Sequence, residues 1–255
     1  FPLGKANVML GLRFDDNDDF GQHTSWRMTW RSPLPIASLP LTLKAAAGTG
    51  FRAPSLYEVA YNRGPFGFPP ASDTELEEEQ SRGWEAGIAW EPDNARLGVT
   101  WFDQRIDNEI FFDLASFSGY LQSQDKTKSK GLEFDGEVIL SAAWRLSANL
   151  TWNETETATG DSRAYRPEWT GAANLFWQGR ILSAVLSGRF ARDAIDTFGQ
   201  PMPDTERLDA SLVAQLTDNL SMAARLENAT DDRAPQLRDY NAVPRSFFLS
   251  LRYTL

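Results

Sequence analysis

Apolar and polar residues alternate along most of this chain with a period of two, the pattern of β-strands that have one apolar face. The final strand shows this most clearly, because one of its faces carries only apolar and aromatic residues, namely Phe247, Leu249, Leu251, Tyr253 and Leu255. Such a strand is rare as the last element of a soluble protein, since chain ends usually fray. The last strand of a barrel closes on the rest of the cylinder and leaves no edge. The pattern at residues 245–255 therefore predicts the closing strand of a β-barrel.

Similar alternation predicts about twelve strands, many of them near the length of about ten residues that a tilted membrane-spanning strand requires. They are Ala6–Phe14, Thr24–Trp30, Leu41–Ala47, Arg82–Trp90, Ala95–Gln104, Lys130–Ile139, Trp144–Asn153, Thr170–Trp177, Leu182–Phe190, Arg207–Gln215, Leu220–Glu227 and Arg245–Leu255. We see no helical periodicity of useful length. The sequence thus predicts an all-β protein, an antiparallel transmembrane β-barrel.

The connections between these strands alternate in length. Short turns lie at Glu91–Asn94, Ser141–Ala143, Gln178–Arg180 and Thr217–Asn219, with a longer one at Arg31–Pro40. Between them lie long loops at Gly48–Ser81, Arg105–Ser129, Glu154–Trp169, Ala191–Glu206 and Asn228–Pro244. Outer-membrane barrels have this arrangement, with the long loops outside the cell. All 14 prolines fall in the predicted connections, as expected when every strand is paired on both sides.

The tryptophans gather at the ends of the strands. Near the short turns lie Trp30, Trp90, Trp144 and Trp177; near the long loops lie Trp26, Trp84, Trp152 and Trp169, with Trp101 between the two groups. Outward-facing tryptophans at both ends predict the two aromatic girdles of a membrane barrel. The alternative is a soluble β-sandwich with tryptophans in its core.

The composition of the chain excludes several classes of protein and several kinds of binding partner. A net charge of −10 argues against nucleic acid as a partner, and the absence of cysteine excludes disulfides and thiolate metal sites. No run of about 18 apolar residues is present, so no transmembrane helix is predicted. The residues Phe1–Gly4 do not begin a signal peptide, so we expect either a mature chain or an internal piece of a longer one.

Five segments, in this order, resemble the TonB-dependent outer-membrane receptors. They are Gly48–Glu58 (GTGFRAPSLYE), Glu75–Gly87 with its Ser-Arg-Gly-Trp-Glu-Ala-Gly end, Lys130–Glu133 (KGLE), Glu227–Asp231 (ENATD) and Tyr240–Phe247 (YNAVPRSF). The resemblance spans residues from about 40 to 255. It departs from the family at Asp73-Thr74, at Ala229-Thr230 and at Leu255. The approach to the last strand looks most like the cobalamin-receptor branch.

The resemblance implies a role for the shared positions and for the whole chain. Structural roles are implied for Gly50, Phe51, Arg52, Pro54, Glu85, Gly131, Glu133, Asn228, Asp231 and Arg245. Family barrels have 22 strands around a plug. Residues 1–255 would thus be the C-terminal part of such a barrel, with the plug and the first strands outside this sequence. We expect a fragment or a truncated gene.

The expected function is that of an outer-membrane receptor of a Gram-negative bacterium that takes up a scarce, large ligand, either cobalamin or a ferric siderophore. Its expected partners are membrane lipid, the small-molecule ligand, the TonB complex through the plug, and the barrel-assembly machinery. That machinery would read the closing strand through Phe247, Leu249, Leu251, Tyr253 and Leu255. No cofactor, metal or enzymatic activity is expected. A porin-like passive channel and, less favoured, a membrane hydrolase are the alternatives.

Candidate ligand contacts are aromatic or polar side chains of the long loops, which suit capture of a large, partly apolar molecule. They are Tyr57, Tyr61, Asn62, Arg63, Phe66, Phe68, Tyr120, Tyr165, Phe198 and Tyr240. The alternative is that these loops pack on themselves.

Two other features are weaker candidates for a functional site. Glu75, Glu77, Glu78 and Glu79 could bind Ca²⁺ or bridge lipopolysaccharide through divalent ions, but a solvated loop fits this spacing better. His23 is the only histidine, and a hydrolase would need it as a base; no Gly-x-Ser-x-Gly elbow accompanies it.

Overall fold

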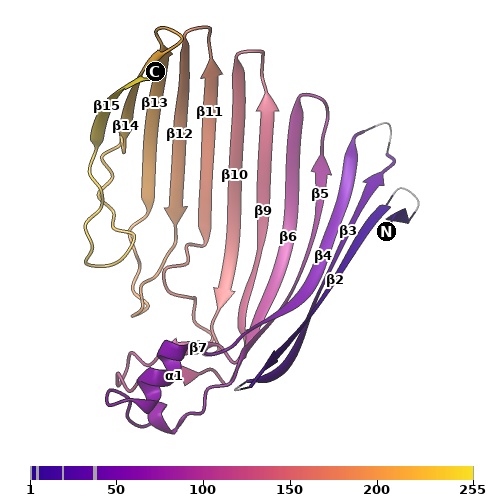
Figure 1. The fold of residues 1–255 in the computed structure, drawn as a ribbon, viewed down its shortest axis with the longest axis vertical. Coiled ribbons are helices and arrows are strands. Elements are labelled where there is room, and N and C mark those ends of the chain that lie inside the picture. Colours follow the sequence, from indigo (N-terminus) through magenta and orange to yellow (C-terminus); the bar gives the residue numbers. More distant parts are fainter. Residues whose placement is uncertain (1, 4–5, 19, 37–38, 255) are drawn as a thin grey trace.

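One large, strongly curved antiparallel sheet makes up most of the molecule (Figure 1). The computed structural model describes residues 2–3, 6–18, 20–36 and 39–254. Strands adjacent in sequence are neighbours throughout the 13-stranded sheet, except that β6 pairs with β9. The strands of this sheet are β1 (Pro2–Leu3), β2 (Ala6–Asn17), β3 (Gly21–Leu34), β4 (Leu41–Arg52), β5 (Glu79–Trp90), β6 (Ala95–Asp107), β9 (Thr127–Ile139), β10 (Trp144–Glu156), β11 (Trp169–Gln178), β12 (Leu182–Arg192), β13 (Thr205–Gln215), β14 (Leu220–Glu227) and β15 (Ser246–Tyr253).

The all-β, antiparallel prediction is confirmed, and each predicted strand has its counterpart. Several strands run further toward the long loops than their alternation indicated: β10 continues to Glu156 and β4 to Arg52. In the extension of β10 the outward residues, Glu154 and Glu156, are charged, so the contrast between the two faces fades although the ladder continues. In the extension of β4 they are Thr49 and Phe51. The short turns lie on one rim of the sheet and the long loops on the other (Figure 1).

The long loops contain regular structure that the sequence did not reveal. Residues after β4 form helix α1 (Leu56–Arg63) and the 3₁₀ turn η1 (Ala71–Asp73). The loop after β6 holds a small hairpin, β7 (Ile110–Phe112) with β8 (Tyr120–Gln122). Helix α1 has too few residues to show a clear helical period, but its capping box, Ser55 with Glu58, was a readable signal. Within the described residues, no helix is long and apolar enough to cross a membrane.

The expectation that every proline lies in a connection is wrong for Pro2, in β1, and for Pro33, near the end of β3. Pro33 pairs with Thr42 of β4, while the pairing of β3 with β2 ends at Arg31. Within the described residues Pro33 has no ladder partner on that side, which suits a residue without a backbone N–H.

Register shows that the two faces of the sheet are sharply different. Residues directly opposite each other share a face, so Trp101, Leu132, Trp152 and Trp169 form one row across four neighbouring strands, β6, β9, β10 and β11. Large apolar residues on this face are exposed; Leu12, for example, is 83% exposed. The other face carries Glu133, Asn149 and Thr151. An apolar convex face with a polar concave face is the arrangement of a membrane barrel wall.

The tryptophan rows lie close to where they were predicted. Near the short turns the rings of Trp144 and Trp177 lie 6.3 Å apart. Near the long loops Trp152 lies 6.5 Å from Trp169 and 6.1 Å from Trp101. Trp101 therefore belongs to the outer row rather than between the rows, because strand tilt shifts equivalent depths along neighbouring strands.

The rim of short turns carries apolar side chains where turns are ordinarily polar. Ile36, Leu140, Ile181 and Leu216 are each about half exposed. They lie beyond the ends of β3, β9, β11 and β13. The rim of short turns, which we call the inner rim, thus continues the apolar face of the sheet.

The sheet is open in the residues that the structure describes. Strand β15 has β14 as its only neighbour, and β1 with β2 forms the opposite edge. The molecule is accordingly part of a barrel wall. Leu255, the last residue of the predicted closing pattern, lies outside the described residues.

Candidate functional site: the outer loops

The loops after β4 and β6 pack against each other, and we refer to residues 53–78 and 108–126 as the aromatic loop pair. Tyr61 on α1 lies at its centre, with ring centroids 5.5 Å from Phe112, 5.8 Å from Tyr120 and 6.3 Å from Phe66. Tyr57 lies 6.1 Å from both Tyr61 and Tyr120. Most of these contacts are edge-on or tilted, the geometry that aromatic pairs favour. The cluster joins helix α1 to hairpin β7–β8. Figure 1 shows α1 and β7 close together on the rim of long loops.

Asn62 joins the same two segments through its side-chain amide. The amide nitrogen donates to the Tyr120 carbonyl and the amide oxygen accepts from the Tyr120 N–H, each at 2.8 Å. Asn62 is 5% exposed, so the amide replaces a strand neighbour for β8. Its hydrogen-bonding groups are used inside the protein, which leaves little of Asn62 for an external ligand.

Arg52, at the end of β4, fixes the base of the aromatic loop pair. Its guanidinium contacts Glu58 on α1 at 3.1 Å and both carboxylate oxygens of Glu79 at 2.7 Å. Glu79 in turn accepts from the N–H of Ile110 at 2.8 Å. Burial alone would raise the pKa of Glu58, but the Arg52 guanidinium and the Ser55 N–H and hydroxyl hold that pKa below its usual range. One side chain therefore orients a helix, a strand and a hairpin together.

The tip of the hairpin is organised by Asp113. The hydroxyls of Ser116 and Ser118 donate to its carboxylate, as do the N–H groups of Ser116 and Ala115, and together they hold the pKa of Asp113 well below its usual range. Gly119 has a φ of +139°, and a Cβ there would lie 2.6 Å from Oδ1 of Asn62. Only glycine fits between the hairpin and α1.

Around this packed centre, several aromatic side chains remain exposed. Tyr57 is 65% exposed, Phe66 70% and Phe68 47%. Arg63 also lies on the surface. Phe111 and Phe117 of the hairpin loop are exposed as well, although we did not predict them. Their place beside Phe112 depends on the hairpin, which no local pattern predicted.

The loops after β10, β12 and β14, residues 157–168, 193–204 and 228–245, form a second unit that we name the polar loop group. Asp196 is 1% exposed and accepts from the N–H groups of Phe198 and Gln200, each at 2.8 Å. Arg238, 42 residues away, forms an ion pair with the same carboxylate. Burial alone would raise the pKa of Asp196, but these donors hold it below its usual range. Neither Asp196 nor Arg238 was predicted, since nothing in the sequence links them.

The remaining predicted contacts belong to the polar loop group. The Tyr165 N–H donates to the Ile195 carbonyl at 2.7 Å, which connects two of its loops. Phe198 is 73% exposed and Tyr240 70%. The predicted residues therefore fall into two clusters: Tyr57, Tyr61, Asn62, Arg63, Phe66, Phe68 and Tyr120 in the aromatic loop pair, and Tyr165, Phe198 and Tyr240 in the polar loop group.

A polar hollow of about 240 Å³ lies on the concave face at the level of the long loops. Strands β6, β9 and β10 contribute Gln104, Ser129 and Asn153, and the loop after β10 contributes Arg163 and Arg166. The Arg163 guanidinium forms an ion pair with Glu109, and the backbone N–H of Arg163 donates to the Thr155 hydroxyl at 3.0 Å. The hollow offers hydrogen-bond donors and a guanidinium to a polar ligand group.

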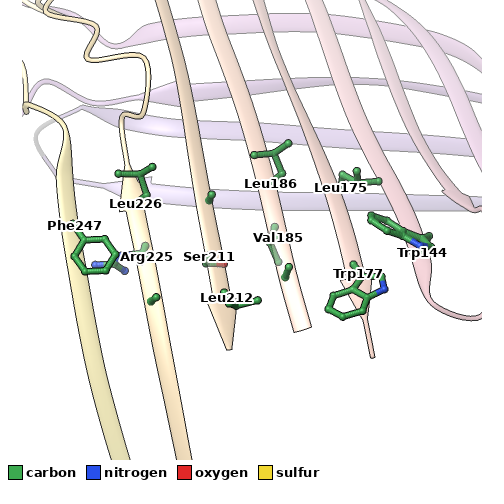
Figure 2. Close-up of a pocket in the computed structure, with 13 residues that line it drawn as sticks. Trp144, Leu175, Trp177, Val185, Leu186, Ser211, Leu212, Arg225, Leu226 and Phe247 are labelled. Atoms are coloured by element: carbon green, nitrogen blue, oxygen red, sulfur yellow. The ribbon is translucent and has the colours of Figure 1, made fainter. Parts of the chain in front are cut away.

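A second hollow, of about 460 Å³, lies on the opposite face and is lined mainly by apolar residues of β10 to β15 (Figure 2). Trp144, Trp177, Leu186 and Phe247 line it. By register these residues share the convex face. This hollow is part of the apolar exterior and does not include any predicted ligand contact.

The acidic run and His23 are engaged in local contacts. Nδ1 of His23 lies 3.7 Å from a Glu78 carboxylate oxygen, and its ring stacks on Phe51 at 4.5 Å. The Glu77 N–H is bonded to the Gln122 side chain, and Glu79 to Arg52. Among the described residues, no group of three or more acidic or histidine side chains could hold a metal ion.

Comparison with known proteins agrees with this architecture. The family described as TonB dependent receptor-like, beta-barrel matches residues 1–229. This chain belongs to that family. The family is one of the outer membrane of Gram-negative bacteria, which is therefore the location of this chain.

Relatives within the family differ in what their names say they transport. The chain is 24% identical over 252 residues to the vitamin B12 transporter BtuB of Vibrio cholerae, covering 95% of this chain and 39% of that protein. It is 26% identical over 264 residues to the ferrienterobactin receptor of Escherichia coli, covering 89% and 34%. The chain thus spans about two fifths of the length of the curated relatives it matches. These relatives are transporters and receptors rather than enzymes.

Solved structures support the fold. The ferric enterobactin receptor PfeA of Pseudomonas aeruginosa superposes with a TM-score of 0.78 at 22% identity, covering 98% of this chain and 43% of that chain. The copper transporter OprC superposes with a TM-score of 0.79 at 16% identity, covering 100% and 45%. At these identities the likeness concerns the fold alone.

Several positions shared with the receptor family are buried or lie where a neighbouring strand leaves no room for a side chain. Beyond Arg52 and Phe51, Pro54 is buried, and a Cβ on Gly50 would lie 3.0 Å from the Ser81 hydroxyl. A Cβ on Gly131 would lie 2.1 Å from the Trp152 carbonyl. Glu85, opposite Phe102, and Glu133, opposite Thr100, lie on the concave face.

The last shared positions organise the loop before β15. Asn228 is 3% exposed and its amide nitrogen donates to the carbonyls of Asp232 and Val243, each at 2.9 Å. The Arg245 N–H donates to Asp231 at 3.0 Å. That hydrogen bond and the Arg233 guanidinium hold the pKa of Asp231 below its usual range. These contacts direct the chain into β15.

Proposed function

We propose that this chain forms the C-terminal wall and part of the outer mouth of a TonB-dependent receptor that takes up a scarce, large ligand. The ligand class is cobalamin or a ferric siderophore, in keeping with the two kinds of curated relative. The work of the protein is recognition and gated passage, with no covalent chemistry. Passage would depend on a plug in the lumen and on the TonB complex, neither of which lies in this sequence.

The observation that carries this proposal is the exposed aromatic surface of the aromatic loop pair beside the polar hollow. Tyr57, Phe66 and Phe68 present rings to the outside on a scaffold that Arg52 and Tyr61 hold in place. A large ligand with a flat, partly apolar body and polar groups fits such a surface, because rings cover the apolar part and Arg166 with its neighbours meets the polar part.

Ligand binding can be measured by quenching of tryptophan fluorescence in the purified, full-length protein, to which these residues contribute nine tryptophans. Cyanocobalamin and ferric enterobactin are the two probes. We expect tight binding of one of them, and about tenfold weaker binding after Tyr57→Ala together with Phe66→Ala, since aromatic contacts typically contribute about 0.5–1.5 kcal/mol each. Leu140→Ala, on the opposite rim, is the matched control.

One outcome would reject the receptor assignment, and a second would reject the aromatic loop pair as the binding surface. Binding of neither probe, together with passive conductance of small solutes across a lipid bilayer, would indicate a channel. Equal binding by the aromatic double variant and the control would show that the aromatic loop pair does not contact the ligand.

A further inference from the structure

On the outward face of the wall, charged side chains replace apolar ones directly beyond the outer tryptophan row. Two residues past that row, register places Asp103, Lys130 and Glu154 side by side on β6, β9 and β10. Two residues further on, it places Arg105, Lys128 and Glu156 side by side. Arg82 lies opposite Arg105 on β5. We name these seven residues the outward charged ladder.

The depth of this ladder can be estimated from strand geometry. Two residues advance about 7 Å along a strand, and a tilt of about 40° reduces this to about 5 Å along the membrane normal. The second layer then lies about 10 Å beyond the tryptophans. The polar headgroup region beyond each side of the hydrocarbon core is about 5–8 Å thick. The first layer thus lies among lipid headgroups, and the second at their outer boundary.

The cations of the ladder are positioned to meet a partner. Lys130 contacts Glu154 at 3.1 Å and Lys128 contacts Glu156 at 3.1 Å, yet both lysine side chains are nearly half exposed. Arg82 contacts Asp107 at 2.9 Å and is 60% exposed, whereas Asp107 is 21% exposed. Exposed ion pairs of this kind contribute little to stability, so their cations can exchange a carboxylate for another anion at low cost.

Among the described residues, register places no row of charged side chains on the outward face at the opposite rim. There the outward face continues into the apolar turn residues Leu140, Ile181 and Leu216. A general need for solubility would place charge at both rims. The one-sided placement fits a partner present only in the leaflet on the side of the long loops, which is the external leaflet.

We propose that the outward charged ladder binds the phosphate groups of a multiply phosphorylated glycolipid headgroup in the external leaflet. Lys128, Lys130, Arg82 and Arg105 would contact the phosphates, in the way that basic clusters at a membrane surface bind anionic headgroups. Asp103, Glu154 and Glu156, which pair with Arg105, Lys130 and Lys128, would give up these cations to the phosphates. This proposal does not depend on the ligand that the receptor transports.

The test uses the full-length protein in detergent micelles with bisphosphorylated lipid A, monophosphorylated lipid A and phosphatidylethanolamine as probes, and native mass spectrometry as the readout. The variant Lys128→Gln with Lys130→Gln removes two cations. Each basic residue near an anionic lipid surface accounts for roughly fivefold in affinity, so we expect about twentyfold weaker binding of bisphosphorylated lipid A. Lys44→Gln is the matched control, because Lys44 lies opposite Gly87 on the concave face.

Two further measurements keep the test decisive. Heat-modifiable migration on a gel confirms that each variant is folded. In the presence of a chelator, Glu154→Gln with Glu156→Gln should strengthen binding, since the lysines lose their competing carboxylates.

The proposal fails if the lysine double variant binds bisphosphorylated lipid A as well as Lys44→Gln does. It also fails if phosphatidylethanolamine shows the same loss, because the ladder would then not distinguish phosphate number. Retention of a neighbouring membrane protein, lost in the double variant without any change in lipid A binding, would assign the ladder to a protein contact instead.

Discussion

The two groups of outer loops achieve order by different means. The aromatic loop pair is joined by rings around Tyr61, with Arg52 at its base. The polar loop group is joined by Asp196, a buried carboxylate that collects an arginine and two backbone N–H groups from segments far apart in sequence. Ring packing is spread over many contacts and tolerates change, whereas a single carboxylate leaves its donors without partners when it is lost.

The largest effect is expected from Asp196→Ala. This change removes the acceptor of Phe198, Gln200 and Arg238 at once. We expect amide exchange in residues 193–204 to become about a hundredfold faster, since hydrogen bonds to a charged group contribute about tenfold or more each. Hydrogen exchange with mass spectrometry measures this, and α1 should be unaffected. Asp218→Ala, in a short turn, is the control. Equal loss of protection in both loop groups would show that they are one cooperative unit.

A smaller effect is expected from Tyr61→Ala in the aromatic loop pair. The ring contacts four others, and its removal from a half-buried site should cost about 2 kcal/mol of local stability. This corresponds to roughly thirtyfold faster exchange in α1 and β7–β8. Leu56→Ala is the matched control on the same helix, because Leu56 is 87% exposed. If both variants exchange alike, the ring cluster does not hold the loops together.

The smallest effect is a difference in pH response. The pKa of Asp196 is lowered, so its carboxylate stabilises the folded loops above about pH 4, the value for an unperturbed Asp, and this stability is lost as pH falls through the folded-state pKa. Burial and the nearby Tyr57 and Glu58 raise the pKa of Tyr120, so the aromatic loop pair loses stability as pH rises above about 10. Alkali should therefore loosen the aromatic loop pair alone, whereas acid should loosen both groups, because the pKa values of Asp113 and Glu58 in the aromatic loop pair are lowered as well.

Spin labels can report the two responses separately. The chain has no cysteine, so Ser72→Cys and Gln236→Cys each provide a single labelling site in one loop group. Electron paramagnetic resonance should show label mobility rising at low pH at both positions, and at high pH only at position 72. A parallel rise at both positions at high pH would contradict the comparison.

Period-two alternation was enough to predict the wall of this protein, because each strand has one lipid-facing and one water-facing side. It could not place α1 or β7–β8, whose order depends on contacts between two loops, such as the pairing of Asn62 with Tyr120 across 58 residues. Tyr57, Phe66 and Phe68 were recognisable as candidates from their residue types and loop positions. The partnership of Asp196 with Arg238 has no local pattern and required the fold.

The apolar turns of the inner rim have a consequence for how the wall responds to its bilayer. Leu140, Ile181 and Leu216 extend the apolar band beyond Trp144 and Trp177, whereas charges end the band sharply above Trp101 and Trp152. Bilayers adjust to mismatch in thickness at a cost of a fraction of a kcal/mol per Å. In a thicker bilayer the turns stay within hydrocarbon while the charges remain at the surface. Differences in bilayer thickness are therefore absorbed on the periplasmic side, and the height of the outer loops above the membrane stays constant.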